Sequence, residues 1–245
     1  AAEVIRSEAA KAIKVGITLN LDPIYPASNS ARDLQAVQMA DTFLNRIVLD
    51  PLLKGTSPLQ ENKMIDALVG NIIKDGDLKK INTLDLLGVN YYTRLVVKHS
   101  NRVPLVKFAQ VNPVGNEYSG MWEIYPEGMY DLLKQIHQEY KPGCDMMVTE
   151  NGVPVPDGLD FDGRIRDIRR IKYLQDHLFQ VHRAIKDGIP IKGYFHWSFM
   201  DNFEWALGYA QRFGLVYVDY ETQDRFVKDS GYWFSDVIKN NGYKS

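Results

Sequence analysis

The stretch Met146-Met147-Val148-Thr149-Glu150-Asn151-Gly152 decides the fold class of this 245-residue chain. A short apolar run precedes a carboxylate, an amide and a glycine, and Pro142-Gly143 marks a turn just upstream. Such a run predicts a strand that is buried on both faces, as strands in parallel sheets are. In α/β barrels the catalytic side chains stand at the carboxyl ends of the strands, where the mouth is open to substrate. Glu150 is therefore a candidate catalytic residue, although this stretch alone fits an ordinary loop carboxylate equally well.

Three further segments repeat this pattern of an apolar run that ends in polar or aromatic residues. They are residues 14–20, ending at Asn20, residues 86–92, ending at Asn90-Tyr91-Tyr92, and residues 191–198, ending at His196-Trp197-Ser198. Apolar residues at helical spacing predict the main helices, at 3–13, 30–49, 127–140, 166–187 and 230–240. Strand and helix thus alternate four times, which predicts an α/β fold with parallel strands.

The segments between these elements carry weaker patterns. Short helices are expected at 61–69 and 77–82, and Asp22-Pro23 with Tyr25-Pro26 predicts an irregular loop. A β excursion is expected around 94–98 and 105–110, and a hairpin near 214–219. Four strand–helix units are half of an eight-stranded barrel, and closure into a barrel needs about eight strands. The chain is therefore expected to form an open sheet or to rely on another half.

Composition restricts the classes of partner. A net charge of −2 gives no reason to expect nucleic acid or an anionic membrane surface, and no run of about 18 apolar residues is present to span a bilayer. One cysteine, Cys144, excludes an intramolecular disulfide and favours a reducing compartment, so a cytoplasmic location is expected. The first ten residues contain early acids and predict no secretory signal. Because the five histidines lack metal-ligand spacing and no glycine-rich phosphate loop is evident, we expect neither metal nor cofactor.

Aromatic residues make up 11% of the chain and gather toward its C-terminal half. The run from Trp197 to Trp205 has an indole at each end and a carboxylate between them. This combination suits a sugar, because a carboxylate binds hydroxyl groups and an aromatic face stacks on the apolar face of a pyranose. Taken singly, each aromatic residue is more often part of a core.

Several motifs in order resemble glycoside hydrolase family 1, the β-glucosidase and β-galactosidase family. They are Val148-Thr149-Glu150-Asn151-Gly152, Asn90-Tyr91-Tyr92, the run from His196 to Trp205, Trp122-Glu123-Ile124-Tyr125-Pro126-Glu127-Gly128 and Arg212-Phe213-Gly214-Leu215. The resemblance covers nearly the whole chain. It implies a (β/α)8 TIM-barrel architecture in which residues 1–245 supply the C-terminal half, strands five to eight with their helices, and no second domain.

The resemblance also implies a role for each candidate site residue. Glu150 would be the nucleophile of a retaining β-glycosidase, and Tyr92 would donate a hydrogen bond to its carboxylate. The substrate would be a β-linked glycoside. The implied substrate-binding residues are Glu204 and Trp205 on the hydroxyls of the −1 sugar, Trp197 as its stacking floor, Trp122 on the aglycone side, Phe213 and Asn90 in the pocket wall, and Asn20 at the same rim.

The sequence departs from the family in the acid/base. A retaining glycosidase needs a second carboxyl group about 5–5.5 Å from the nucleophile, and the family carries it in an Asn-Glu-Pro motif that this sequence lacks. Of the local carboxylates, Glu204 already has a sugar-binding role, and Glu123, Glu127 and Asp201 are expected to be loop, cap or surface groups.

Two hypotheses follow. Either the chain is a β-glycosidase half that is weak or inactive until a complementary N-terminal half-barrel supplies the acid/base, or it is an incomplete half-barrel that binds ligands without efficient turnover. In both, the uncovered inner face and edges predict that it pairs with that half or with a second copy of itself.

Overall fold

The computed structural model describes residues 2–61, 73–74, 76–78, 84–120 and 122–243. The short helices expected at 61–69 and 77–82 fall almost entirely outside these residues. Within the described part of the chain, none of the helices is both long and apolar enough to cross a membrane.

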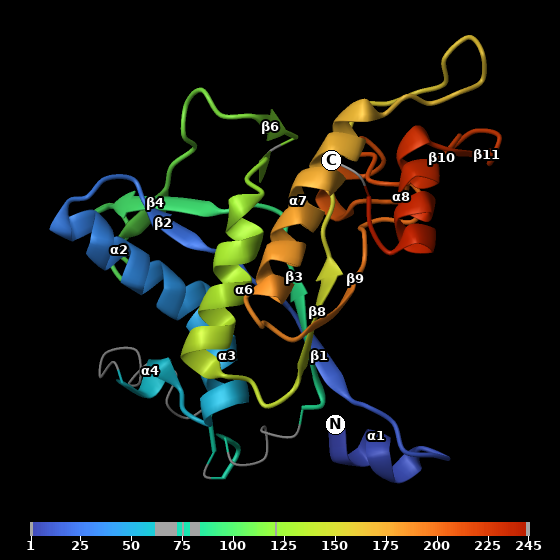
Figure 1. The fold of residues 1–245 in the computed structure, drawn as a ribbon. Helices are drawn as coiled ribbons and strands as arrows, with labels where there is room; N and C mark the ends of the chain where they lie inside the picture. Colours follow the sequence, from blue (N-terminus) through green and yellow to red (C-terminus); the bar gives the residue numbers. More distant parts are fainter. Residues whose placement is uncertain (1, 62–72, 75, 79–83, 121, 244–245) are drawn as a thin grey trace.

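A parallel sheet of four strands lies at the centre of the fold (Figure 1). Its strands are β1 (Gly16–Asn20), β3 (Leu86–Asn90), β8 (Asp145–Glu150) and β9 (Ile191–Tyr194), and they pair in that order. All three pairings are parallel, as the alternation of strands and helices predicted. The prediction of an α/β fold with four strand–helix units is therefore confirmed.

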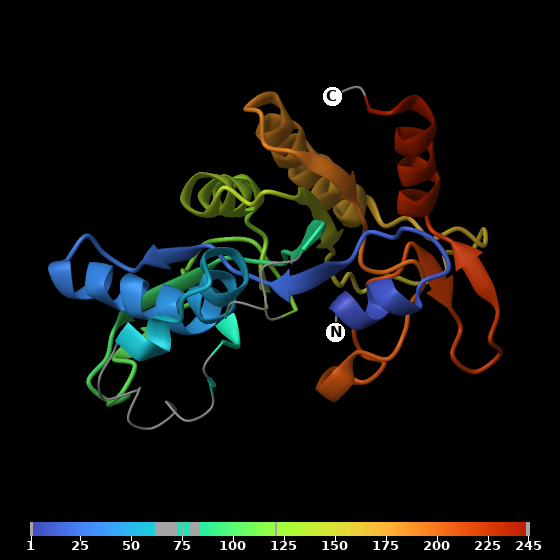
Figure 2. The same ribbon diagram turned by 90° about the horizontal axis from the view of Figure 1, so that it is seen from below.

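Helices α6 (Glu127–Tyr140) and α7 (Ile168–Lys186) cover one side of this sheet (Figure 2). Helix α6 has the predicted bounds. The four apolar residues whose helical spacing predicted its inward face, Met129, Leu132, Leu133 and Ile136, belong to the main core. The strands contribute alternate residues to that core, and the cluster also takes in the end of α7. Its central members are Leu87, Val89, Met129, Leu132, Leu133, Ile136, Met146, Val148, Val181 and Ala184.

The helix after β1 is longer than predicted. Helix α2 (Ala31–Asp41) runs on through two π-helical segments, η1 (Thr42–Arg46) and η2 (Asp50–Lys54), with α3 (Ile47–Leu49) between them. The expected end at residue 49 is wrong, because the backbone of Leu49 and Asp50 is still helical and Pro51 lies inside η2. The helix ends instead at Gly55, whose φ of 67° is the left-handed conformation that glycine adopts freely.

Three small sheets and some short helices flank the central sheet. The β excursion and the hairpin are confirmed, but β2 was missed because Pro23 and Pro26 predicted a loop. It pairs parallel to β4, and α2 packs on its sheet. The bounds are β2 (Ile24–Pro26), β4 (Leu95–His99) and β5 (Phe108–Gln110) in one sheet, β6 (Tyr118–Ser119) with β7 (Trp122–Glu123), β10 (Val216–Val218) with β11 (Arg225–Val227), and the helices α1 (Ala2–Glu8), α4 (Pro58–Glu61), η4 (Trp205–Leu207) and α8 (Asp229–Asn240).

One face of the strands is not covered in this chain, as expected for a half-barrel, although the apolar runs are typical of strands that are buried on both faces. In β8 the side chains alternate, so that Met146 and Val148 are buried and their neighbours are only partly covered. On the other face a Cβ at Gly88 would stand 2.4 Å from the Thr18 hydroxyl and 2.8 Å from Thr149, so this face is small and polar at its centre. Strand β1 is almost wholly exposed, because helices cover only one face of the sheet and β1 forms its edge.

Candidate active site

The carboxyl ends of the central strands bring three predicted site residues into register. Asn20 pairs with Asn90, and Asn90 pairs with Glu150. The Thr149 hydroxyl donates a 2.8 Å hydrogen bond to the Asn90 side-chain oxygen, which fixes that amide beside Glu150. The shared rim predicted from the strand ends is therefore present, with Asn20 at its exposed end.

Tyr92 orients the carboxylate of Glu150. Its hydroxyl donates a 2.7 Å hydrogen bond to Oε2 of Glu150 across a sequence separation of 58 residues. Burial first, and then the bond to Glu150, raise the pKa of Tyr92 well above its ordinary value. The phenol consequently remains a proton donor over the working pH range, and it holds the carboxylate of Glu150 in one orientation.

Asn151 anchors the strand end that carries Glu150, a role that sequence reasoning missed. The side chain is fully buried; its amide donates to the Tyr91 carbonyl at 2.7 Å and to the Tyr173 hydroxyl at 2.8 Å. Its oxygen accepts a 2.7 Å hydrogen bond from the Tyr194 hydroxyl. One amide thus ties β8 to the ends of β3 and β9 and to α7. The sequence did contain a signal for this role. An asparagine follows the apolar run directly, and tyrosines stand near the ends of two other predicted strands.

Gly152 allows the chain that follows β9 to lie close against the end of β8. A Cβ at this position would lie 1.8 Å from the carbonyl oxygen of Trp197, which no side chain tolerates. The Trp197 N–H donates a 3.0 Å hydrogen bond to the Asn151 carbonyl, so the chain still pairs with β8 beyond Tyr194, where β9 ends. Half-buried Trp197 is thereby held next to the strand end that bears Glu150.

An imidazole lies under this contact. His196 places its Cε1 atom 3.4 Å from the position of a Gly152 Cβ, and its Nε2 is 3.2 Å from the Phe213 carbonyl oxygen. Burial, followed by the positive charge of Arg170, lowers the pKa of His196 to about 3. The ring is therefore neutral at physiological pH and serves as packing beneath the rim.

Three of the predicted residues form an aromatic wall beside Glu150. The ring of Tyr92 lies 4.8 Å from that of Trp122 and 6.3 Å from that of Phe213, and Trp122 and Phe213 are 5.6 Å apart. Trp122 is held by its neighbour Glu123, which is buried and forms two hydrogen bonds with Arg94, at 2.8 and 3.0 Å. The structure thus brings these three rings together next to the carboxylate of Glu150.

Trp122 is one of the residues that line a hollow of about 490 Å³. The polar residues of its lining include Thr93, Arg94, Gln110 and Asn112. Asp22 completes it, and burial raises the pKa of that carboxyl to about 6. Hydroxyl-bearing groups would find hydrogen-bond partners here.

The remaining predicted residues lie on the sugar-site loop, which we define as residues 197–213. Glu204 is half-buried and close enough to Tyr92 for its charge to contribute to the raised pKa of that phenol. Trp205 is 84% exposed, so the structure does not bring its indole onto the wall. Glu123 and Asp201, two of the local carboxylates considered as a second acid, are instead held in ion pairs with Arg94 and with Arg212 and Lys228.

Comparison with known proteins agrees with this geometry. The model of glycosyl hydrolase family 1 matches residues 1–243. The chain belongs to this family. The beta-glucosidase A of Thermotoga maritima is 43% identical over 237 residues, which are 96% of this chain and 52% of that relative. The chain therefore spans about half the length of the curated relatives it matches.

Solved structures give the same picture. A family 1 β-glucosidase from Thermotoga maritima matches with a TM-score of 0.89 at 40% identity, over 99% of this chain and 54% of that one. The same enzyme in complex with glucoimidazole matches with a TM-score of 0.88 at 41% identity, with the same coverage. These neighbours are TIM barrels, and the four strand–helix units described here correspond to half of such a barrel, as the motifs predicted.

Proposed function

We propose that this chain carries the nucleophile of a retaining β-glycosidase. The observation that carries the proposal is the carboxylate of Glu150 at a strand end, oriented by Tyr92 and flanked by the wall of Tyr92, Trp122 and Phe213. The family's relatives are named β-glucosidases, which favours β-D-glucosides as the substrate class.

In the proposed mechanism, Glu150 attacks the anomeric carbon of the −1 sugar. A bond forms between the carboxylate and that carbon, the glycosidic C–O bond breaks, and its electron pair leaves with the aglycone oxygen. A second carboxylic acid protonates that oxygen and then, as a base, activates the water that hydrolyses the glycosyl-enzyme. Tyr92 keeps the attacking oxygen aligned in the first step, because its phenol remains protonated.

The other site residues would bind the sugar. Glu204 and Trp205 would bind the hydroxyls, Trp197 would stack beneath the ring, and Asn90 with Phe213 would complete the wall. Asn20 would add an amide at the exposed end of the rim. Trp122 would separate this sugar from the aglycone, and the polar groups in the hollow that it lines suit an aglycone that is itself a sugar.

The second carboxyl group would come from a complementary N-terminal half-barrel. Strand β1 presents an open edge and exposed side chains on which that half, or a second copy of this chain, would pair. Two copies alone would bring two Glu150 residues to one mouth without an acid/base, so only the complementary half would give efficient turnover.

A mechanism-based label tests the role of Glu150. A 2-deoxy-2-fluoro β-glucoside with a good leaving group should label Glu150 when the chain is mixed with a matching N-terminal half, and peptide mapping locates the label. Glu150→Gln should abolish labelling and lower aryl-glucoside hydrolysis by about 10⁴-fold or more. Light scattering of the mixture checks that the halves associate, and Glu139→Gln, at an exposed position of α6, is the matched control for covalent labelling. Labelling of another residue would refute the assignment.

A second candidate function is ligand binding without efficient turnover. It is favoured by the ion pairs that occupy Glu123 and Asp201 and keep these carboxylates from acting as the acid. General acid–base catalysis contributes about 10²–10⁴-fold, so the chain alone is expected to hydrolyse unactivated β-glucosides weakly or not at all. Turnover of cellobiose by the purified chain alone would exclude this candidate.

A further inference from the structure

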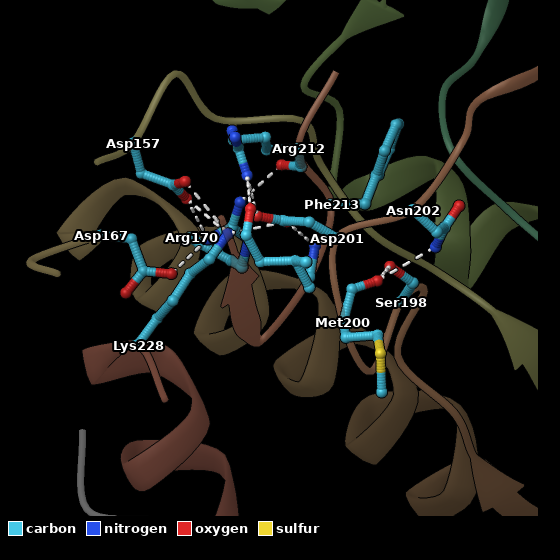
Figure 3. A network of polar contacts seen from close by, with 12 residues as sticks. Asp157, Asp167, Arg170, Ser198, Met200, Asp201, Asn202, Arg212, Phe213 and Lys228 are labelled. Atoms are coloured by element: carbon cyan, nitrogen blue, oxygen red, sulfur yellow. Dashed lines mark hydrogen bonds and ion pairs between the residues drawn. The ribbon is translucent and has the colours of Figure 1, made fainter. Parts of the chain in front are cut away.

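A network of buried charges lies behind the sugar-site loop (Figure 3). Five of its six side chains are at most 4% exposed, and the sixth, Arg212, is 18% exposed. Three carboxylates balance three cations, so the network is neutral overall. Its members are Asp157, Asp167, Asp201, Arg170, Arg212 and Lys228.

The loop itself contributes two members, Arg212 near its end and Asp201 near its start, and Asp201 joins the two. Its Oδ1 accepts hydrogen bonds from the Lys228 ammonium at 2.9 Å and from the Gly214 N–H at 2.8 Å, and its Oδ2 accepts one from the Arg212 guanidinium at 2.7 Å. One carboxylate therefore joins the two ends of the loop and attaches both to the start of α8.

Lys228 extends this attachment to the segment that leaves Glu150. Its ammonium donates to both oxygens of Asp157, at 2.9 and 3.0 Å. Asp157 also accepts a 2.8 Å hydrogen bond from Arg170, and Arg170 donates at 2.7 Å to the Arg212 carbonyl. These contacts form a closed circuit that begins and ends in the loop. The base of the loop is therefore fixed against the segment that follows β8, the strand that carries Glu150.

The tip of the same loop lacks such anchoring and lies largely exposed. Phe203 is 60% exposed and Trp205 84%, whereas Asp201 is 3% exposed. Glu204 and Trp205 thus depend on the base of the loop for their position relative to Glu150. A buried ion pair adds little net stability, because desolvation offsets the attraction, and a role in specifying one conformation is the better explanation of such a network.

We infer that Asp201 and Lys228 are positioning residues for sugar binding. They contact no substrate; they set where Glu204 and Trp205 stand relative to Glu150 by fixing the base of the loop to Asp157. The inference rests on the proposed function only in the identity of the bound sugar, since the placement of the loop can be measured without any ligand.

A matched pair of variants separates positioning from stability. Asp201→Asn and Asp167→Asn each remove one buried carboxylate charge from the same network and keep the shape of the side chain. Asp167 bonds to Arg170 and Ser230, which join α7 to α8. Hydrogen exchange of the amides of residues 198–213 should be about tenfold faster in Asp201→Asn, and nearly unchanged in Asp167→Asn. Equal exchange of the loop in the two variants would overturn the inference.

Lys228 provides an independent test. Lys228→Met should accelerate exchange in the loop as Asp201→Asn does, and Lys228→Arg, which keeps the charge, should restore the protection. If Lys228→Met does not fold, the comparison of Asp201→Asn with Asp167→Asn still decides. Fast exchange in Lys228→Arg equal to that in Lys228→Met would contradict a role for the charge.

Kinetics of the reconstituted enzyme give the functional readout. With the matching N-terminal half present, Asp201→Asn should raise KM for an aryl β-glucoside about tenfold with a smaller loss of kcat, because it loosens groups that grip the sugar. Asp167→Asn should leave both constants unchanged per folded molecule. A wild-type mixture with no activity would refute the proposed function, whereas the exchange measurements would still test the positioning.

Discussion

The strand end at Asn151 and the tip of the sugar-site loop serve the same candidate site in opposite ways. Asn151 is fully buried, and its side chain makes three hydrogen bonds to the chain around it. Trp205 is 84% exposed at the loop tip. The group proposed to make a covalent bond thus stands on a fully bonded base, whereas groups proposed to bind the sugar stand where little of the fold depends on them.

The contrast separates the determinants of stability from those of binding. A reacting carboxylate must be held within a fraction of an ångström, so its support is built into the core. Loop residues that contact substrate are instead expected to gain much of their burial from the ligand or from a partner chain. Substitutions at the two places should therefore differ sharply in their effect on folding.

The largest effect is expected at Asn151. Asn151→Leu removes three hydrogen bonds and leaves the hydroxyls of Tyr173 and Tyr194 without this partner, at about 1–3 kcal/mol for each buried group left unsatisfied. We expect the free energy of unfolding in urea to fall by roughly 3 kcal/mol or more. Asn101→Leu, at an exposed position, is the control and should change it by less than about 0.5 kcal/mol. Similar losses in the two variants would break the comparison.

A smaller, pH-dependent effect is expected from the histidines beneath the site. Burial lowers the pKa of His177 to about 4 and that of His196 to about 3. Both pKa values lie below the unfolded value of about 6.5, so the unfolded chain binds more protons. The stability that these residues contribute is complete above about pH 6.5 and is lost as the pH falls toward their folded-state values.

His177→Phe tests this pH dependence. The side chain stacks on Tyr173 with ring centroids 3.8 Å apart, which a phenyl ring can reproduce. Between about pH 6 and 4 the unfolding free energy of the variant should decline less steeply, by about 1.4 kcal/mol per pH unit, since one fewer proton is taken up on unfolding. Urea titrations at several pH values measure the slope, and parallel slopes for variant and wild type would contradict the expectation.

The smallest effect on folding is expected at the loop tip. Trp205→Ala should change the unfolding free energy by less than about 0.5 kcal/mol, as exposed substitutions usually do. In the mixture with the N-terminal half, the same variant should weaken the binding of a non-hydrolysable β-glucoside by about tenfold, corresponding to the loss of about 1.4 kcal/mol of contact energy. Calorimetry measures both quantities. A large loss of stability with unchanged binding would reverse the roles assigned to the two regions.

Much of the fold follows from local patterns in the sequence. The apolar spacing of Met129, Leu132, Leu133 and Ile136 predicted both the bounds and the inner face of α6, because periodicity determines which side of a helix meets a sheet. The strand ends likewise predicted that Asn20, Asn90 and Glu150 would share a rim.

What the sequence did not predict depends on neighbours distant along the chain. Strand β2 forms because β4 pairs with it, despite the prolines that favoured a loop. The polar inner face was missed because Thr18, Gly88 and Thr149 are brought together only by strand register. The sequence showed Asn151 only as a member of the motif around Glu150. Its structural role depends on hydrogen bonds with Tyr91, Tyr173 and Tyr194, which are distant along the chain. Such partners cannot be paired from spacing alone.

The neutral network behind the sugar-site loop has a consequence for protein engineering. Residues 197–213 cannot be exchanged between related enzymes as an independent cassette, because Asp201 pairs with Lys228 as well as with Arg212, and the contacts of Lys228 and of the Arg212 carbonyl continue to Asp157 and Arg170 outside it. A chimera that moves the loop alone would bury unbalanced charge wherever the recipient differs at those outside positions. The smallest transplantable module is the loop together with its three outside partners, so recombination libraries that aim to alter sugar preference should keep all of these positions from one parent.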